Sequence, residues 1–134
     1  MFKETYLAKH KDWKASERKG DHVEIVTSVA RPILAPDESM VREYGKIREG
    51  QGKIQNDIVS SWWNSEYVPR YLEKIENSLP ARQRISWLQW KEHELREKDK
   101  SLWVVCYEGP KALQGTRHCH RFILLDILEG RIKL

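Results

Sequence analysis

The sequence predicts an α/β fold, a small and mostly parallel sheet covered by helices in a Rossmann-like three-layer sandwich. Two nearly continuous apolar runs, at 22–30 and 102–106, are typical of strands buried on both faces, as in parallel sheets. Helical patterns separate and follow these runs, and such alternation favours parallel strands with helical crossovers. Because 134 residues is near the usual size of one domain, we expect a single α/β domain over residues 1–134.

Three segments are predicted to be strands. Phe2–Leu7 is rich in aromatic and β-branched residues, which favour strands. The run His22–Ala30 should end at Arg31-Pro32, because proline cannot donate a hydrogen bond to a sheet. Leu102–Cys106 is the third predicted strand, and it reads as fully buried.

Helical signals occupy the middle of the chain. A helix should begin near Pro36-Asp37-Glu38, where acidic residues suit the N-terminal dipole, and end near Arg48 before Gly50. Residues 51–61 predict a polar connector. Beyond it, four apolar residues at four-residue spacing predict one stripe of a helix: Trp63, Tyr67, Tyr71 and Ile75.

Two further helices complete the pattern. Leu79-Pro80 should end one helix and open the next, because proline is tolerated only in the first turn of a helix. Near the end of the sequence, an apolar face that includes Phe122 and Leu125 predicts a helix from about Arg117. Gly130 is suited to end that helix.

Composition limits the compartment and the partners. No apolar run approaches the roughly 20 residues that span a bilayer, and residues 1–14 lack a signal-peptide pattern, so we expect a cytoplasmic location without membrane contact. With only two cysteines, reduced thiols are expected rather than a disulfide scaffold. The net charge of +4 is compatible with phosphate-bearing partners, including nucleic acid. Nothing in the sequence predicts the oligomeric state.

Nucleophilic and charged side chains gather where the third strand should end and the last helix should begin. Cys106 and Glu108 close the strand, and ligands of open α/β sheets bind beyond the carboxyl ends of the strands. Cys119 stands at the predicted helix start, whose free N–H groups and dipole favour anions and lower the pKa of a thiol. The candidate catalytic residues are Cys119, Glu108 and Cys106, and the candidate ligand-binding residues are Arg121, His120, Arg31 and Ser28.

Each candidate also fits a purely structural role. Cys106 lies inside an apolar strand, where a cysteine is often a small core residue. Glu108 could simply cap a turn. Arg121 could pair with Asp126 or Glu108, and Arg31 could brace the following loop.

Two metal sites compete with this interpretation. His118-Cys119-His120 has the His-hydrophobic-His form with which single-strand nicking endonucleases hold a metal, but that chemistry needs a strand, a third ligand and a nucleophilic tyrosine. A zinc site from Cys106, Cys119 and a nearby histidine lacks the usual paired spacing of cysteine ligands. The sequence alone therefore predicts no metal and no cofactor.

The segments Val104–Glu108 and Cys119-His120-Arg121 resemble the signature of the domain-of-unknown-function 488 family. In that family a strand ending in Cys-Tyr-Glu or a variant of it precedes a helix that opens with Cys-His-Arg. Weaker matches lie upstream, at Thr5–Leu7, Ser28–Pro32, Leu34–Pro36 and Tyr67–Tyr71. The resemblance implies an α/β sandwich of bacterial or phage origin and no established reaction.

Two functions remain open. The first is an enzyme or ligand-binding domain for a phosphate-bearing small molecule, a nucleotide or a nucleic-acid end. There, Cys119 would be the nucleophile or anion contact, Glu108 the general acid or base, and Arg121 the anion clamp.

The second function is a non-enzymatic nucleic-acid or protein binding module, such as a phage factor that engages a host component. Its support is the positive charge and a tryptophan-rich middle in which Arg82 and Arg84 lie near tryptophans able to stack on bases. These tryptophans are Trp62, Trp63, Trp87 and Trp90.

Overall fold

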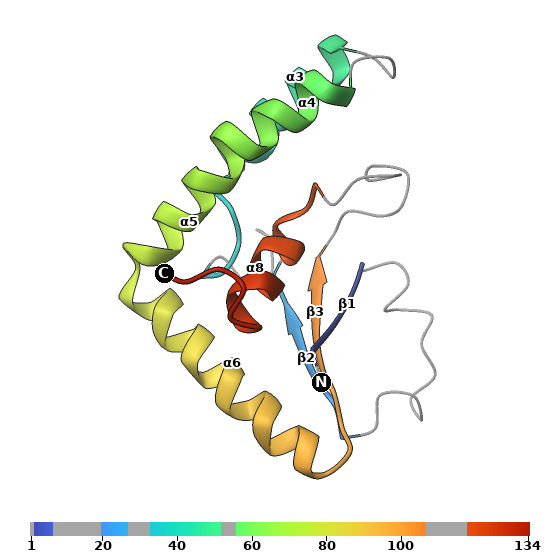
Figure 1. Cartoon of the computed structure of the whole chain (residues 1–134), viewed down its shortest axis with the longest axis vertical. Helices are drawn as coiled ribbons and strands as arrows, with labels where there is room; N and C mark the ends of the chain where they lie inside the picture. Colours follow the sequence, from blue (N-terminus) through green and yellow to red (C-terminus); the bar gives the residue numbers. More distant parts are fainter. Residues whose placement is uncertain (1, 7–19, 27–32, 52–55, 107–117) are drawn as a thin grey trace.

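The structure is a computed structural model, and it describes residues 2–6, 20–26, 33–51, 56–106 and 118–134. Strands and helices alternate along this part of the chain (Figure 1). In chain order they are β1 (Phe2–Tyr6), β2 (His22–Ile25), α3 (Glu38–Gln51), α4 (Asn56–Trp62), the π-helical segment η1 (Trp63–Tyr67), α5 (Val68–Glu76), α6 (Leu79–Glu97), β3 (Leu102–Cys106) and α8 (His120–Leu128).

The three strands form one parallel sheet in the order β1-β3-β2. β3 is therefore central, and its Val104 is aligned with Glu4 of β1 and Glu24 of β2. Because side chains alternate along a strand, Leu102, Val104 and Cys106 point to the same face of the sheet. The predicted α/β class with a small parallel sheet is confirmed.

The helices pack against this face. α6 and α8 both contact β3, and α8 also contacts β1. In Figure 1, α3, α4, α5 and α6 form a bent arm, and α8 lies between this arm and the sheet. The described residues thus provide the sheet and one helical layer of the expected sandwich.

The segment expected as a polar connector is largely helical, so that prediction was wrong for 56–61. α3 continues through Gly50 to Gln51, because a single glycine costs a helix only about 1 kcal/mol. α4 then begins at Asn56. Its Val59 is buried, as is Trp63 in the next turn, and this apolar side holds the otherwise polar segment to the rest of the arm.

The predicted apolar stripe is confirmed, and all four of its members lie in the core: Trp63, Tyr67, Tyr71 and Ile75. Residues four apart on an α-helix rotate by about 40° with each step. The π turn reduces this drift, since the N–H of Val68 donates to the carbonyl of Trp63, five residues back. Pro69 follows at the start of α5, where its missing N–H is tolerated.

An ion pair joins α6 to the edge strand β2. Glu24 is buried and accepts hydrogen bonds from Nε and Nη2 of Arg84, at 2.8 and 2.6 Å, and from Nε2 of His22, at 2.9 Å. Burial alone raises the pKa of Glu24, but the hydrogen bonds from His22 and Arg84 outweigh it and hold the pKa below its ordinary value. The Arg84 guanidinium also lies over the ring of Trp87, 4.4 Å from its centroid.

Candidate functional site

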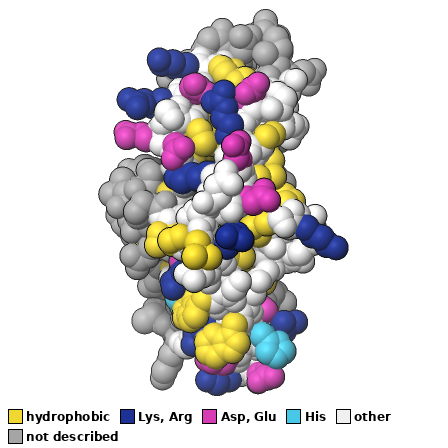
Figure 2. All heavy atoms as spheres, turned by 90° about the vertical axis from the view of Figure 1, so that its left-hand side faces the viewer, with side chains coloured by type: hydrophobic (Ala, Val, Ile, Leu, Met, Phe, Trp, Pro, Cys, Tyr) yellow, Lys and Arg dark blue, Asp and Glu magenta, His cyan; other side chains and the backbone are white. Residues whose placement is uncertain are grey.

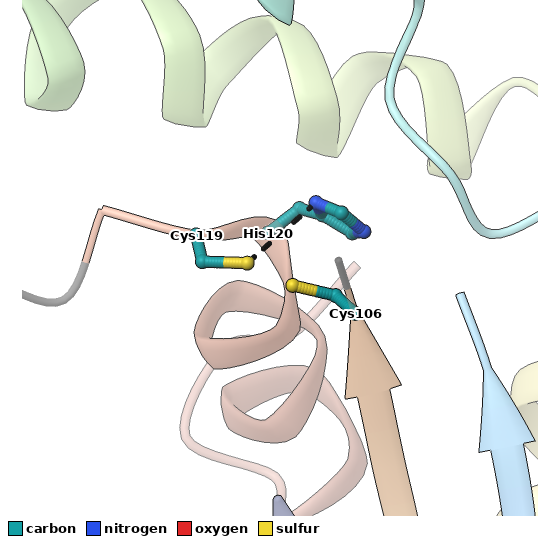
Figure 3. A group of neighbouring side chains, drawn as sticks. All are labelled: Cys106, Cys119 and His120. Carbon is teal, nitrogen blue, oxygen red and sulfur yellow. Dashed lines mark hydrogen bonds between the residues drawn. The ribbon is translucent and has the colours of Figure 1, made fainter. Parts of the chain in front are cut away.

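Two cysteines and a histidine from two segments, the end of β3 and the start of α8, meet at the carboxyl end of β3 (Figure 3). Cys106 is the last residue of β3, Cys119 is the N-cap of α8, and His120 is the first residue of α8. Both sulfur atoms and a ring nitrogen of His120 lie within 4.8 Å of one another, and all three residues are buried. The only two cysteines of the chain thus face each other without a disulfide between them.

A backbone hydrogen bond determines what the His120 ring can do. Its Nε2 donates to the carbonyl of Val26 at 2.6 Å, so the proton of the neutral ring resides on Nε2 and Nδ1 carries a lone pair. Nδ1 lies 3.9 Å from the sulfur of Cys119. Nδ1 can therefore accept the thiol proton of Cys119 or bind a metal ion.

Arg121 places a buried positive charge against both sulfurs. Its Nη1 lies 3.2 Å from Sγ of Cys106 and 3.7 Å from Sγ of Cys119, while its Nε donates to Glu4 at 2.5 Å. Burial alone lowers the pKa of Arg121, but the charge of the two sulfurs and of Glu4 raises it, and the net direction is upward. A guanidinium in this position stabilises a thiolate.

Tyr71 of α5 lies against the imidazole from the side of the helical arm. The Tyr71 and His120 ring centroids are 5.9 Å apart, and the Tyr71 hydroxyl donates to the carbonyl of Leu34 at 2.6 Å. Burial raises the pKa of Tyr71, and the charge of the nearby sulfurs raises it further. Tyr71 therefore stays protonated and acts as a positioning residue for His120.

His118 is held in a different environment from His120. Its Nδ1 lies 2.8 Å from the Tyr44 hydroxyl and its Nε2 lies 3.4 Å from Oγ of Ser60. The ring stacks on Trp63, with centroids 4.9 Å apart. The two histidines thus face different partners at a helix start, which argues against the metal motif of nicking endonucleases.

The structure brings four of the seven candidate site residues together: Cys106, Cys119, His120 and Arg121. Glu108, Arg31 and Ser28 lie outside the described residues. Sequence reasoning missed Glu4 and the carbonyl of Val26, which hold Arg121 and His120 in place. The one signal in the sequence that could have indicated Glu4 was the presence of an acidic residue inside the first predicted strand.

The four tryptophans of the middle segment do not share one surface. Trp63 is buried and Trp62 is half-buried against Tyr44, at 6.2 Å between ring centroids. Trp87 and Trp90 of α6 are exposed, by 37% and 57%. Charged side chains of both signs are scattered over the outer face of the helices (Figure 2), so this face shows no single basic patch.

Comparisons with known protein families, with curated proteins and with solved structures found no match to this chain. The resemblance to the domain-of-unknown-function 488 family therefore stays a prediction. None of the helices in the described ranges has both the length and the apolar character that a bilayer crossing requires.

Proposed function

We propose that this domain is a thiol-dependent enzyme or ligand-binding domain for a phosphate-bearing small molecule, a nucleotide or a nucleic-acid end. The single observation that carries the proposal is the contact of the Cys119 sulfur with Nδ1 of His120 on one side and with Arg121 on another. A base beside the thiol and a cation beside the thiolate are the two ordinary means of activating a cysteine nucleophile.

The place of the cluster supports an anionic substrate. Cys119 is the N-cap of α8, the end of the helix where the dipole favours negative charge, although its sulfur accepts no capping hydrogen bond. The same spot adjoins the carboxyl end of β3, where ligands of parallel sheets bind. A phosphate oxygen bound there would share Arg121 with Glu4. Free thiols also fit the cytoplasmic location that the sequence predicts.

In the enzymatic form of the proposal, His120 takes the proton of Cys119, and the sulfur forms a bond to phosphorus. The bond from phosphorus to the leaving alcohol oxygen breaks, and the alcohol takes the proton from His120. Water then displaces the sulfur from phosphorus, which releases phosphate and regenerates the thiol. No oxidant or second substrate is needed.

Alkylation by iodoacetamide tests the activation of Cys119. Cys119 is only 2% exposed, so iodoacetamide must reach its sulfur through a local opening of the fold. Once reached, we expect this thiol to react faster than glutathione at pH 7, because the base and the cation favour the thiolate. Cys106→Ser should keep the fast reaction, and Cys119→Ser should lose it. His120→Gln should slow it, whereas His93→Gln, which changes an exposed histidine of α6, should not.

Inorganic phosphate and nucleotides provide the ligand test. Either should protect Cys119 from alkylation in a saturable manner, and Arg121→Lys should weaken that protection. If both thiols react only after the protein is unfolded by urea, the cysteines are packing residues and the proposal is wrong.

A nucleic-acid binding role is a second candidate, favoured by the exposed pair Trp87 and Trp90. Their ring centroids are 6.5 Å apart on α6, and the two residues are 37% and 57% exposed. Arg84 lies over the ring of Trp87, so Trp90 offers the more open surface for stacking on a base. Single-stranded oligonucleotides should then quench the tryptophan fluorescence, and Trp87→Ala with Trp90→Ala should weaken binding by at least about tenfold. Trp62→Ala is the control. Binding that is unchanged in the double variant would contradict this role.

A further inference from the structure

We propose that Cys106, Cys119 and His120 form a Zn²⁺ site, and that metal occupancy reversibly blocks the Cys119 thiol. The site consists of residues of this chain alone, so it does not depend on which substrate the domain takes. Two sulfurs and an imidazole nitrogen are a ligand set that selects zinc over magnesium or calcium.

The distances in the cluster suit a tetrahedral ion. Zinc bonds of about 2.3 Å to sulfur and 2.0–2.1 Å to nitrogen place neighbouring ligand atoms about 3.5–3.8 Å apart. All three ligand atoms lie within 4.8 Å of one another, and Sγ of Cys119 is 3.9 Å from Nδ1 of His120. Shifts of less than about 1 Å would therefore place the three ligand atoms at three corners of a tetrahedron around the ion.

The surroundings of His120 support metal ligation. A ligating histidine commonly donates its other ring N–H to a carbonyl or carboxylate, which fixes the tautomer and the ring orientation. The carbonyl of Val26 accepts that hydrogen bond from Nε2 and leaves the Nδ1 lone pair on the side of Cys119. The ring is fixed further by Tyr71, which packs against it.

Charge balance also supports a divalent cation. Metal-bound cysteines are thiolates, so Cys106, Cys119 and Glu4 together carry three negative charges, against one positive charge on Arg121. Zn²⁺ would neutralise the remainder. Arg121 can stay beside the metal as a hydrogen-bond donor to both sulfurs, at 3.2 and 3.7 Å, which is the outer-shell role of such groups.

Three protein ligands leave the fourth position of the ion for water or an anion. A metal in this place would hold the Cys119 sulfur in a coordinate bond, which uses one of its lone pairs and lowers its nucleophilicity. Zn²⁺ is therefore expected to act as a reversible inhibitor of thiol chemistry, released by a chelator.

The experiment is a titration of the reduced, metal-free full chain with Co²⁺ and then with Zn²⁺. We expect one Co²⁺ per chain with a thiolate-to-cobalt charge-transfer band in the near ultraviolet and intense visible bands of tetrahedral cobalt. Zn²⁺ should displace it. Cys106→Ser, Cys119→Ser and His120→Gln should each weaken binding by more than about tenfold, and His93→Gln should bind as the wild type does.

The outcomes separate this inference from the proposed function. Absence of the charge-transfer band in the folded wild-type protein, checked by circular dichroism, would overturn the metal site whatever the variants do. A band without fast alkylation of the metal-free protein would support the metal site and contradict the activated nucleophile. Fast alkylation that Zn²⁺ fails to slow would contradict the blocking of Cys119 by the metal and leave the proposed function standing.

Discussion

Replacing Tyr71 by alanine is expected to lower the free energy of unfolding by about 3–5 kcal/mol, the range for truncation of a large buried aromatic side chain. Tyr71 is fully buried where α5, the loop at Leu34 and α8 meet. The substitution would leave a cavity beside His120 and deprive the Leu34 carbonyl of its hydrogen bond. Urea unfolding followed by circular dichroism measures the loss.

Tyr71→Phe separates the two contributions, because it removes only the hydroxyl. It should cost about 1–3 kcal/mol, the range for a buried acceptor left without its partner. Leu79→Ala, at a 55% exposed position of α6, should change stability little. If Tyr71→Ala and Leu79→Ala lower the free energy of unfolding by the same amount, Tyr71 does not hold the helical arm to the site.

Replacing Arg84 by methionine is expected to cost about 3 kcal/mol, the lower end of the range for breaking a buried ion pair. The Glu24 carboxylate is only 3% exposed and would keep a single hydrogen-bond partner, His22. The lower end applies because the Arg84 side chain is 33% exposed, so water can reach part of the pair. Arg82→Met, at an exposed position of the same helix, is the matched control.

The double variant Glu24→Gln, Arg84→Met should recover part of the loss, since no buried charge is left without a partner. If the single Arg84→Met change proves as mild as Arg82→Met, the ion pair contributes nothing measurable.

The same ion pair predicts a dependence of stability on pH. The folded-state pKa of Glu24 is lowered, so its contribution is fully present above the pKa of the unfolded chain and is lost as the pH falls through the folded value. The stability difference between wild type and Glu24→Gln should therefore narrow in acid. A difference that is constant from neutral to acidic pH would contradict this assignment.

The elements with strong local signals could be predicted from the sequence. The first part of the β-branched run, His22–Ile25, is a strand, and residues 27–30 of that run lie outside the described residues. The apolar run Leu102–Cys106 is also a strand, and the break at Leu79-Pro80 lies where α6 begins. Such patterns depend on periodicity and on proline, which act within a few neighbouring residues. α4 was missed because its polar sequence is stabilised by contacts with α3 and η1 that no local pattern reveals.

The sequence predicted the location of the site but not the orientation of its side chains. Strand and helix ends predicted that Cys106 and Cys119 lie near one another, and they do. The direction of each side chain depends on distant partners: Val26 turns His120 toward Cys119, and Glu4 holds Arg121 beside the sulfurs. Nothing in the Cys-His-Arg segment itself shows that its histidine faces a sulfur rather than solvent.

The hydrogen bonds that hold the site residues in place also determine when the site can form during folding. The hydrogen bonds that hold His118, His120 and Arg121 join residues 74, 94 and 117 positions apart in the chain. Contacts of such sequence separation form only after large loops have closed, so they arise late in folding. Until β1, β2 and β3 have paired, the two thiols lack the imidazole and the guanidinium that distinguish them from ordinary cysteines. The proposed reactivity of the thiols therefore requires the completed fold.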